Sequence, residues 1–164
     1  MRLILTAVLL LAASTATAGV KAGDRAPSIR SAQTRTGKPI SWKALRGEIV
    51  VLTFGASWCA PCKRELPAFD KVAVTLRGKE KHSVRFLAVN LDDEVAAGKR
   101  FVKSLGLDCV IPIFDPEGRI AASFGPPVMP TTYIVDRNGI VRHVHKGYKK
   151  GDARAIEKEV RKLL

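Results

Sequence analysis

The chain has 164 residues, of which 46% are hydrophobic, and a formal net charge of +13 at pH 7. This length suffices for one domain with a sizeable core. The basic excess raises nucleic acid as a partner, but no stripe of Lys and Arg interleaved with aromatic residues is present, so we expect none. We interpret the charge as a solvated basic surface, with attraction to acidic proteins or to an anionic membrane surface as the functional alternative.

Residues 1–18 have the pattern of a signal peptide. A short positive start is followed by an apolar stretch of eleven residues, Leu3 to Ala13, and by the small-x-small cleavage pattern Ala16-Thr17-Ala18. Eleven residues are too few to span a bilayer comfortably, and no Cys follows closely as a site for a lipid anchor. We therefore predict cleavage near Ala18, a mature domain of residues 19–164 without a stable membrane span, and a periplasmic or otherwise extracytoplasmic location.

Residues 19–48 form a polar lead-in punctuated by Gly and Pro, in which Trp42 and Leu45 are expected to pack over one edge of a sheet. The continuous apolar run from Ile49 to Phe54 then predicts a strand buried on both faces. After a small-residue turn, apolar positions recur at helical spacing, which predicts a helix from about Trp58 to Gly78.

Two cysteines, Cys59 and Cys62, stand at the start of this predicted helix, one turn apart and close enough to close a small disulfide ring. Cys59 lies where unpaired N–H groups and the helix dipole favour a thiolate, and Lys63 and Arg64 add positive charge. Cys62 points back into the helix and is predicted to be the less exposed, resolving thiol. A bridge over two intervening residues constrains almost no chain entropy, so in an exported protein we interpret it as redox chemistry rather than as a staple.

The next segments predict alternating strands and helices. Val84–Asn90 is predicted to be a second buried strand, parallel to the first because a helix connects them. The acidic run Asp92-Asp93-Glu94 is interpreted as ordinary capping of a helix over Val95–Leu105. Cys109 lies between apolar residues and is interpreted as a small buried hydrophobe, with an intermolecular or regulatory thiol as the alternative.

The C-terminal part predicts a short helix over residues 120–124, a hairpin of strands 131–135 and 140–145 joined at Asn-Gly, and a final helix over residues 153–164 with Asp152 as its N-cap. His143 and His145 alternate on one strand face. A solvated face of an edge strand explains them better than a metal site does.

The string Trp58-Cys59-Ala60-Pro61-Cys62-Lys63, preceded by a buried strand, resembles the active site of the thioredoxin superfamily. With Glu65 and Pro67 included, it is most similar to extracytoplasmic thiol-disulfide oxidoreductases of the TlpA/ResA type, over roughly residues 23–164. The resemblance implies an α/β thioredoxin fold: a central mixed β-sheet flanked by helices on both faces, with an N-terminal extension. It also implies a protein disulfide oxidoreductase that needs no cofactor or metal.

That resemblance implies partners as well. They would be client proteins with disulfides or thiols, such as the heme-site cysteines of apocytochrome c or copper-site cysteines. This chain would act as their reductant, for example in cytochrome c maturation, with electrons arriving from a membrane thiol donor. Ala60 and Pro61, between the cysteines, are the expected redox-tuning residues, because Ala-Pro resembles reducing rather than strongly oxidising members.

The resemblance assigns catalysis to Cys59, Cys62 and Glu65. In thioredoxin a buried Asp six residues before the first Cys takes a proton, but here that position is Thr53, which cannot. Glu65, three residues after Cys62 on the same helical face, is the candidate replacement. The alternative for Glu65 is an exposed ion-pair partner of a nearby Lys or Arg.

A second part of the site is predicted downstream. Met129-Pro130-Thr131, entering a strand, resembles the cis-proline loop of the superfamily, which faces the disulfide and offers backbone hydrogen bonds to an extended client. An ordinary trans proline is the alternative. Together with Trp58, which is expected to pack beside Cys59, these residues form the predicted substrate-binding set.

Three other classes were compatible with parts of the pattern. A zinc site needs a second ligand pair, and Cys109 is the one cysteine left, with no His near it. A peroxiredoxin-like peroxidase needs Thr-x-x-Cys, whereas residues 56–59 read Ala-Ser-Trp-Cys. A Cu(I)-binding metallochaperone, with Cys59, Cys62 and Met129 as soft ligands, stays open and would show tight stoichiometric Cu(I) binding without reductase activity.

Overall fold

The computed structural model describes residues 19–30, 32–79 and 84–164. The predicted signal peptide, residues 1–18, lies outside the described residues. Within the described part, no helix combines the length and the apolar character needed to cross a membrane.

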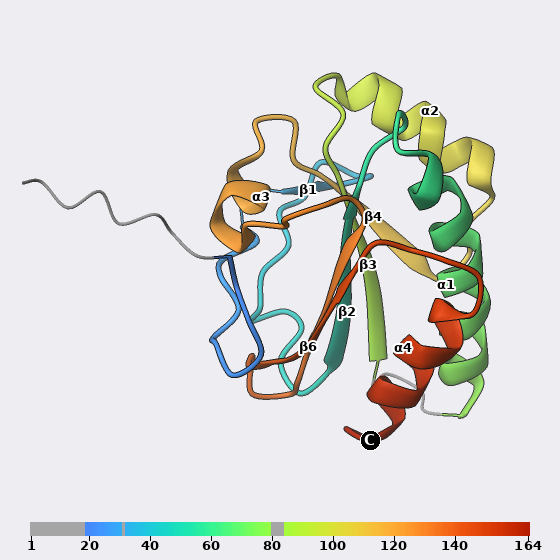
Figure 1. Cartoon of the computed structure of the whole chain (residues 1–164). Helices are drawn as coiled ribbons and strands as arrows, with labels where there is room; N and C mark the ends of the chain where they lie inside the picture. Colours follow the sequence, from blue (N-terminus) through green and yellow to red (C-terminus); the bar gives the residue numbers. More distant parts are fainter. Residues whose placement is uncertain (1–18, 31, 80–83) are drawn as a thin grey trace, which may run out of the picture.

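The core of the fold is a six-stranded mixed sheet with the strand order β1-β4-β3-β2-β5-β6 (Figure 1). Strands β2, β3 and β4 are parallel, whereas β5 is antiparallel to β2, β6 to β5, and β1 to β4. The strand bounds are β1 Gln33–Thr34, β2 Ile49–Gly55, β3 Val84–Asn90, β4 Val110–Phe114, β5 Thr131–Val135 and β6 Val141–Lys146.

The central position of β2 follows from its sequence. Six successive residues, from Ile49 to Phe54, are buried, as a continuous apolar run requires when both faces of a strand are covered. Helix α1 crosses over from β2 to β3, so the two strands pair in parallel, with Ile49 opposite Val84 and Gly55 opposite Asn90.

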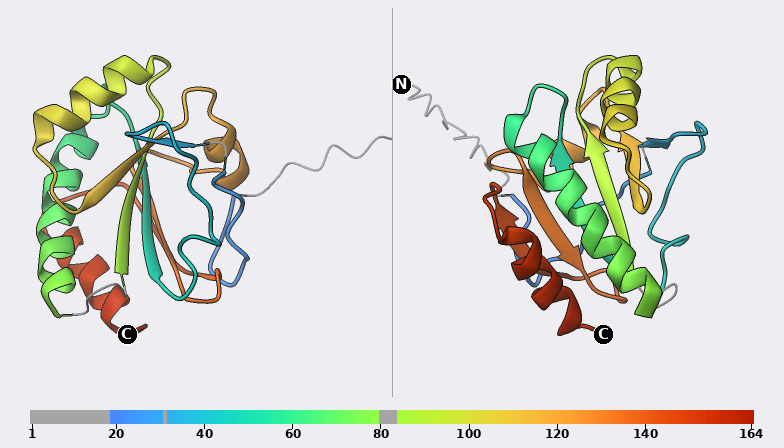
Figure 2. Two further views of the ribbon diagram at one scale, coloured as in Figure 1. Left: turned by 180° about the vertical axis from the view of Figure 1, so that it is seen from behind. Right: turned by 90° about the vertical axis from the view of Figure 1, so that its right-hand side faces the viewer.

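Helices cover both faces of the sheet, as predicted. Alternate residues of β2 point to opposite sides: Ile49 and Val51 join a core cluster with α1, α2 and α4, whereas Val50 and Leu52 join a second cluster with α3 and the lead-in. The left view of Figure 2 shows α1, α2 and α4 on one side of the sheet and α3 with the lead-in on the other. The helix bounds are α1 Ala60–Lys79, α2 Val95–Leu105, α3 Arg119–Phe124 and α4 Asp152–Arg161.

The lead-in is packed more deeply than the sequence suggested. Leu45 is buried and Trp42 packs against the second cluster, so the two residues cover a face of the sheet rather than an edge. The indole Nε1 of Trp42 donates to the Pro27 carbonyl at 2.6 Å, which fixes the ring against the lead-in. The lead-in also contains the two-residue strand β1, which pairs with β4.

The last helix, α4, begins one residue earlier than predicted. Gly151, not Asp152, is its N-cap, and Asp152 is its first residue. The Asp152 carboxylate accepts from the backbone N–H of Lys149 at 2.8 Å and lies 2.9 Å from His145 Nε2. His145 and His143 are half-buried on β6, with ring centroids 6.4 Å apart, rather than fully solvated.

Cys109 is half-buried and packs against the cluster that contains α1, α2 and α4. Its sulfur lies 3.8 Å from Nη1 of Arg77. Cys109 thus packs against apolar residues, as predicted, but it is less buried than predicted.

Candidate active site

The two cysteines meet where β2 ends and α1 begins. Cys59 immediately precedes α1 and forms a disulfide with Cys62, with the two Cα atoms 5.3 Å apart. The backbone N–H of Cys62 points at the Cys59 sulfur at 3.3 Å. Such N–H groups at a helix start stabilise a thiolate, so the geometry favours Cys59 as the sulfur that carries negative charge.

Both cysteines are buried, and Cys62 is the less exposed of the two. Cys59 is 5% exposed and Cys62 is 1% exposed. A Cβ atom at Gly55, the last residue of β2, would lie 2.9 Å from the Cys62 sulfur. Gly55 therefore lets Cys62 pack directly against the end of the strand, a requirement that the sequence analysis missed.

The loop that precedes β5 lies at the same end of the sheet. Thr131, the first residue of β5, pairs with Phe54, which is next to the end of β2. The Met129–Pro130 bond is cis, as predicted. The structure thus brings the Met129-Pro130-Thr131 loop and the cysteine pair to one edge, although they are far apart in the chain.

The predicted substrate-binding residues differ in their exposure. Trp58 is 63% exposed, so most of its ring faces solvent rather than packing against Cys59. Met129 is half-buried, whereas Pro130 and Thr131 are buried. The Thr131 hydroxyl donates to the Val128 carbonyl at 2.7 Å, so its side chain holds the loop rather than offering a contact surface. Val128, which was not predicted, is 49% exposed.

Glu65 is buried, not paired on the surface. Only 1% of the residue is exposed, and its carboxyl group contacts two threonine hydroxyls, Thr53 at 2.8 Å and Thr132 at 3.1 Å. Desolvation by burial raises the pKa of Glu65 from its ordinary 4.5 to about 8, an effect that these two hydrogen bonds oppose and the nearby Asp152 carboxylate supports.

The threonine contacts can be made by either form of the carboxyl group. The hydroxyls of Thr53 and Thr132 are also 3.1 Å from each other, so three polar groups make three contacts. When Glu65 is protonated, the carboxyl group and the two hydroxyl groups have three protons for these three contacts, so each contact can be a hydrogen bond. When Glu65 is ionised, only the two hydroxyl protons are available for the three contacts. Thr53, which cannot replace the Asp of thioredoxin, instead helps to hold Glu65.

Glu65 and the inner cysteine border the same small cavity. Glu65 and Cys62 both line it, together with Thr53, Gly55 and apolar residues of β3 and α2. Its volume of about 10 Å³ is near the smallest that holds one water molecule. Glu65 and Cys62 are therefore neighbours of one buried space, although they come from successive turns of α1.

Asp92 positions the turn that leads into the cysteines, a role the sequence analysis did not find. Its buried carboxylate accepts from the Ser57 hydroxyl at 2.6 Å, from the Ser57 N–H and from the Asn90 amide at 2.7 Å. The acidic run does supply the N-cap of α2, Glu94, but the Glu94 side chain makes no cap hydrogen bond. The sequence does contain a signal for this role. Asp92 follows the end of the strand at Asn90, and the parallel pairing of β2 and β3 places that strand end beside the turn before Cys59.

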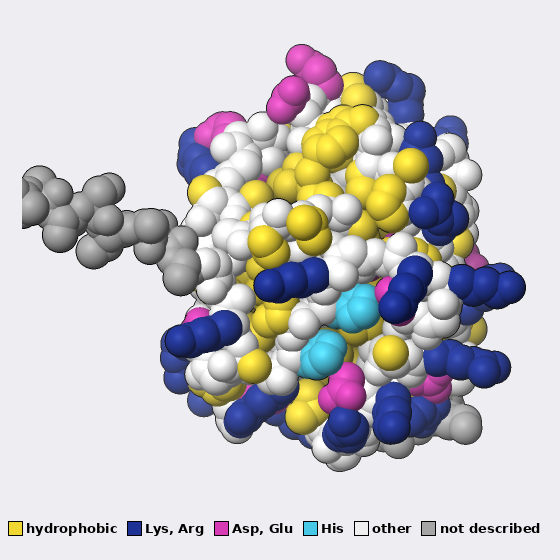
Figure 3. Space-filling model, in the orientation of Figure 1, with side chains coloured by type: hydrophobic (Ala, Val, Ile, Leu, Met, Phe, Trp, Pro, Cys, Tyr) yellow, Lys and Arg dark blue, Asp and Glu magenta, His cyan; other side chains and the backbone are white. Residues whose placement is uncertain are grey.

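The surface around the cysteine pair combines apolar and basic groups. Apolar side chains gather at the upper end of the molecule in Figure 3, the end where β2 gives way to α1. A groove of about 490 Å³ adjoins the turn and is lined by Ser57, Lys63, Arg100 and residues of α2. Neither Lys63 nor Arg100 takes part in an ion pair with any described residue.

Comparison with known proteins agrees with this geometry. A family model described as Redoxin matches residues 21–163. The chain belongs to the Redoxin family. This redoxin is 31% identical over 131 residues to the thioredoxin-like protein YneN of Bacillus subtilis (strain 168), an alignment that covers 79% of this chain and 74% of YneN.

Two further similarities concern proteins named for disulfide chemistry. The redoxin is 31% identical over 102 residues to the thiol-disulfide oxidoreductase ResA of Geobacillus thermodenitrificans (strain NG80-2), covering 62% of this chain and 56% of ResA. A crystal structure of a putative thiol:disulfide interchange protein DsbE from Chlorobium tepidum superimposes with a TM-score of 0.79 at 29% identity, covering 88% of this chain and 99% of that one.

The redoxin thus spans about three quarters of YneN but little more than half of ResA. The thioredoxin fold is confirmed by the sheet order and by the structural similarity. With the bonded Cys59–Cys62 pair, the redoxin has a thiol-disulfide oxidoreductase centre.

Proposed function

We propose that this redoxin is an exported disulfide reductase, in which Cys59 attacks client disulfides, Cys62 resolves the mixed disulfide and Glu65 moves the proton. The observation that carries the proposal is the enclosed cavity that Cys62 shares with a Glu65 whose pKa is about 8. A buried group that titrates near the pKa of a thiol suits proton exchange with a thiol.

The reaction starts from the dithiol form. The Cys59 thiolate attacks one sulfur of the client disulfide, so that a mixed disulfide forms and the first client sulfur leaves as a thiolate, which takes a proton from water. Cys62 then loses its proton to the Glu65 carboxylate and attacks the Cys59 sulfur. The second client sulfur leaves as a thiolate, which takes a proton from water, and the Cys59–Cys62 disulfide remains. Two electrons have passed to the client.

The state of Glu65 sets the pH dependence of the second step. With a pKa of about 8, only about a tenth of Glu65 is ionised at pH 7, and the ionised fraction rises through pH 8. Resolution by Cys62 therefore accelerates as the pH rises over this range. In the opposite direction, protonated Glu65 returns the proton to the Cys62 thiolate when the disulfide is reduced.

Client binding would use the groups around the disulfide. Trp58 and Val128 offer exposed apolar surface on two sides of the site, and the backbone of Met129 is available for strand addition by an extended client. Lys63 and Arg100 in the adjoining groove, which form no ion pair within the described part of the chain, favour clients with acidic residues near the cysteine.

The wider setting follows from the sequence and the relatives' names. The signal-peptide pattern supports an extracytoplasmic location, in the periplasm or outside the cell. The names ResA and DsbE support disulfide exchange with other proteins. We propose apocytochrome c or copper-site cysteines as clients and a membrane thiol donor as the electron source, because an exported reductant must be reduced again after each cycle.

The test is to trap the intermediate. Cys62→Ser protein should accumulate a mixed disulfide through Cys59 when mixed with an oxidised peptide that carries one disulfide, detected by mass spectrometry. Cys59→Ser should form none at the same peptide concentration. Cys109→Ser is the matched control, and it should form no more mixed disulfide with the peptide than the unchanged protein does. Equal trapping by Cys59→Ser and Cys62→Ser would contradict the assignment of the attacking sulfur.

A further inference from the structure

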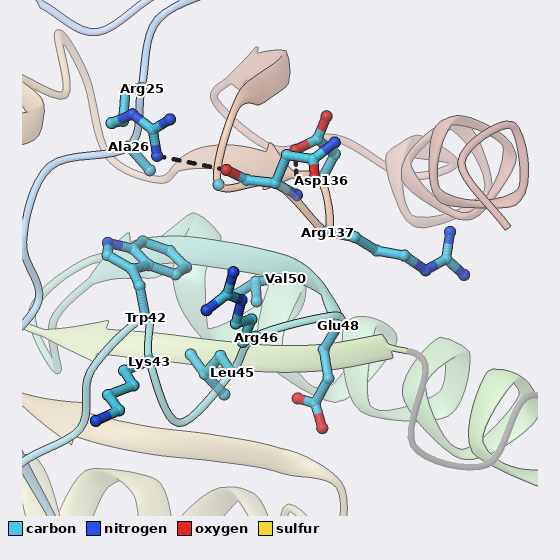
Figure 4. A pocket seen from close by; sticks show the side chains of 12 residues that line it. Arg25, Ala26, Trp42, Lys43, Leu45, Arg46, Glu48, Val50, Asp136 and Arg137 are labelled. Carbon is cyan, nitrogen blue, oxygen red and sulfur yellow. Dashed lines mark hydrogen bonds between the residues drawn. The ribbon is translucent and has the colours of Figure 1, made fainter.

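A second hollow lies at the opposite end of the sheet from the disulfide. Its volume is about 480 Å³, and it is lined by the lead-in, by the segment before β2 and by the β5–β6 turn (Figure 4). It lies where β2 begins, whereas Cys59 follows the end of β2, and a strand of this length extends over about 20 Å. The hollow is therefore separate from the redox site. Its volume is within the range of small-molecule pockets.

The acidic residues of this hollow are already neutralised. Glu48 accepts two hydrogen bonds from Arg85, each 2.8 Å long. Asp136 accepts from Arg142 at 2.7 Å and from two backbone N–H groups at 2.9 Å. In Figure 4 the Glu48 carboxylate also points away from the hollow. Neither carboxylate is left to neutralise the cations that remain.

Those cations are Arg25, Lys43, Arg46 and Arg137. Arg137 extends away from the hollow in Figure 4 and donates to the carbonyl of Leu163. Arg25 makes one long contact, 3.5 Å, to the carbonyl of Asn138. Lys43 and Arg46 form no ion pair with any residue the structure describes. Arg25 and Arg46 therefore face the hollow from two sides with donors available.

The floor of the same hollow is apolar. It is formed by Ala26, Leu45 and Val50, which are buried, and by the indole of Trp42. The hydrogen bond from Trp42 to the Pro27 carbonyl holds the ring in place, so the flat surface exists before any ligand binds. A bare inorganic anion would leave this floor uncovered, whereas an apolar or aromatic group would cover it.

We infer that this hollow binds a small organic anion, with its carboxylate or phosphate group against Arg25 and Arg46 and its apolar body against Trp42 and Leu45. Guanidinium groups bind such oxyanions through paired hydrogen bonds. A ligand at this place would connect the lead-in to the β5–β6 turn. It would therefore stabilise the folded chain by an amount that grows with the logarithm of the ligand concentration above Kd. The site is independent of the proposed disulfide chemistry.

The test uses three probes that separate charge from apolar surface: phenyl phosphate, inorganic phosphate and benzyl alcohol. Binding to the purified oxidised protein is measured by isothermal titration calorimetry, and the Tm is recorded at each concentration. Phenyl phosphate should bind saturably, about tenfold or more tightly than inorganic phosphate, and should raise the Tm. Benzyl alcohol should bind far more weakly than phenyl phosphate. Equal affinity for phenyl phosphate and inorganic phosphate would overturn the role of the apolar floor.

Two charge reversals locate the site. Arg46→Glu should weaken phenyl phosphate binding about tenfold or more, since a charge-assisted hydrogen bond is lost. Arg154→Glu changes the net charge equally at an exposed position of α4 and should leave the affinity unchanged. Arg25→Gln provides a milder second variant should Arg46→Glu not fold. Equal weakening by Arg46→Glu and Arg154→Glu, or no saturable binding at all, would overturn the inference. The rate of disulfide reduction should be the same in every variant.

Discussion

The buried Glu65 makes the free energy of unfolding of the oxidised protein depend on pH. Substitution of Glu65 by a residue that does not titrate should remove this dependence. In the unfolded chain Glu65 loses its proton near its ordinary pKa of 4.5, whereas in the folded protein it keeps the proton up to a pKa of about 8. Between these values the folded state binds more protons than the unfolded state. The free energy of unfolding therefore falls as the pH rises through this range.

The size of the effect follows from the same two pKa values. Raising a pKa from 4.5 to about 8 corresponds to a limit of about 5 kcal/mol between the fully protonated and fully ionised carboxyl group. Structural relaxation and entry of water reduce this cost. We expect Glu65 to lower the free energy of unfolding by about 3 kcal/mol between pH 5 and pH 8.

The perturbation is Glu65→Gln, whose amide fits the same place and can donate to one threonine and accept from the other. Urea unfolding of both oxidised proteins, followed by tryptophan fluorescence from pH 5 to pH 8, gives the free energies. The unchanged protein should lose stability relative to Glu65→Gln as the pH rises. Glu94→Gln, at an exposed position, should follow the unchanged protein. The quantity to compare is the difference in free energy of unfolding between the unchanged protein and Glu65→Gln. If this difference changes by less than about 0.5 kcal/mol between pH 5 and pH 8, the raised pKa is refuted.

Three further predictions concern the surroundings of the site. Asp92→Ala removes the acceptor for Ser57 and Asn90 and should lower the free energy of unfolding by about 2–3 kcal/mol in urea titrations, whereas the exposed Asp93→Ala should change it by less than about 0.5. Gly98→Ala places a Cβ atom 2.0 Å from the Asn90 amide oxygen. It should cost about 1–3 kcal/mol, and an unchanged midpoint would contradict the tight packing of α2. Lys63→Glu should slow reduction of an acidic peptide disulfide several-fold at low salt and speed that of a basic one. An identical effect on both peptides would rule out charge selection.

The sequence predicts the framework well where a pattern is local. The strand over Thr131–Val135 and the helix over Val95–Leu105 have the bounds expected from their sequences, because apolar periodicity and flanking glycines decide them. The CxxC spacing likewise placed Cys59 at the start of α1. These elements depend on residues that are close in the chain.

The contacts that shape the site come from pairings across the sheet, which local patterns do not contain. Thr132 reaches Glu65 because β5 pairs with β2 and sets Thr132 opposite Thr53. Asp92 reaches Ser57 across 35 residues because β3 ends beside the turn after β2. In sequence, an acid before a helix looks like a cap; only the register shows that it holds the turn before the cysteines.

The reduction potential of the Cys59–Cys62 pair tests the proposed reductase most directly. Purified protein is equilibrated with dithiothreitol and glutathione buffers, quenched with acid, and the thiol and disulfide forms are separated. A reductant of client disulfides should have a value near the thioredoxin end, roughly −270 mV. A value near about −120 mV would contradict the account and identify the pair as an oxidant that makes new disulfides.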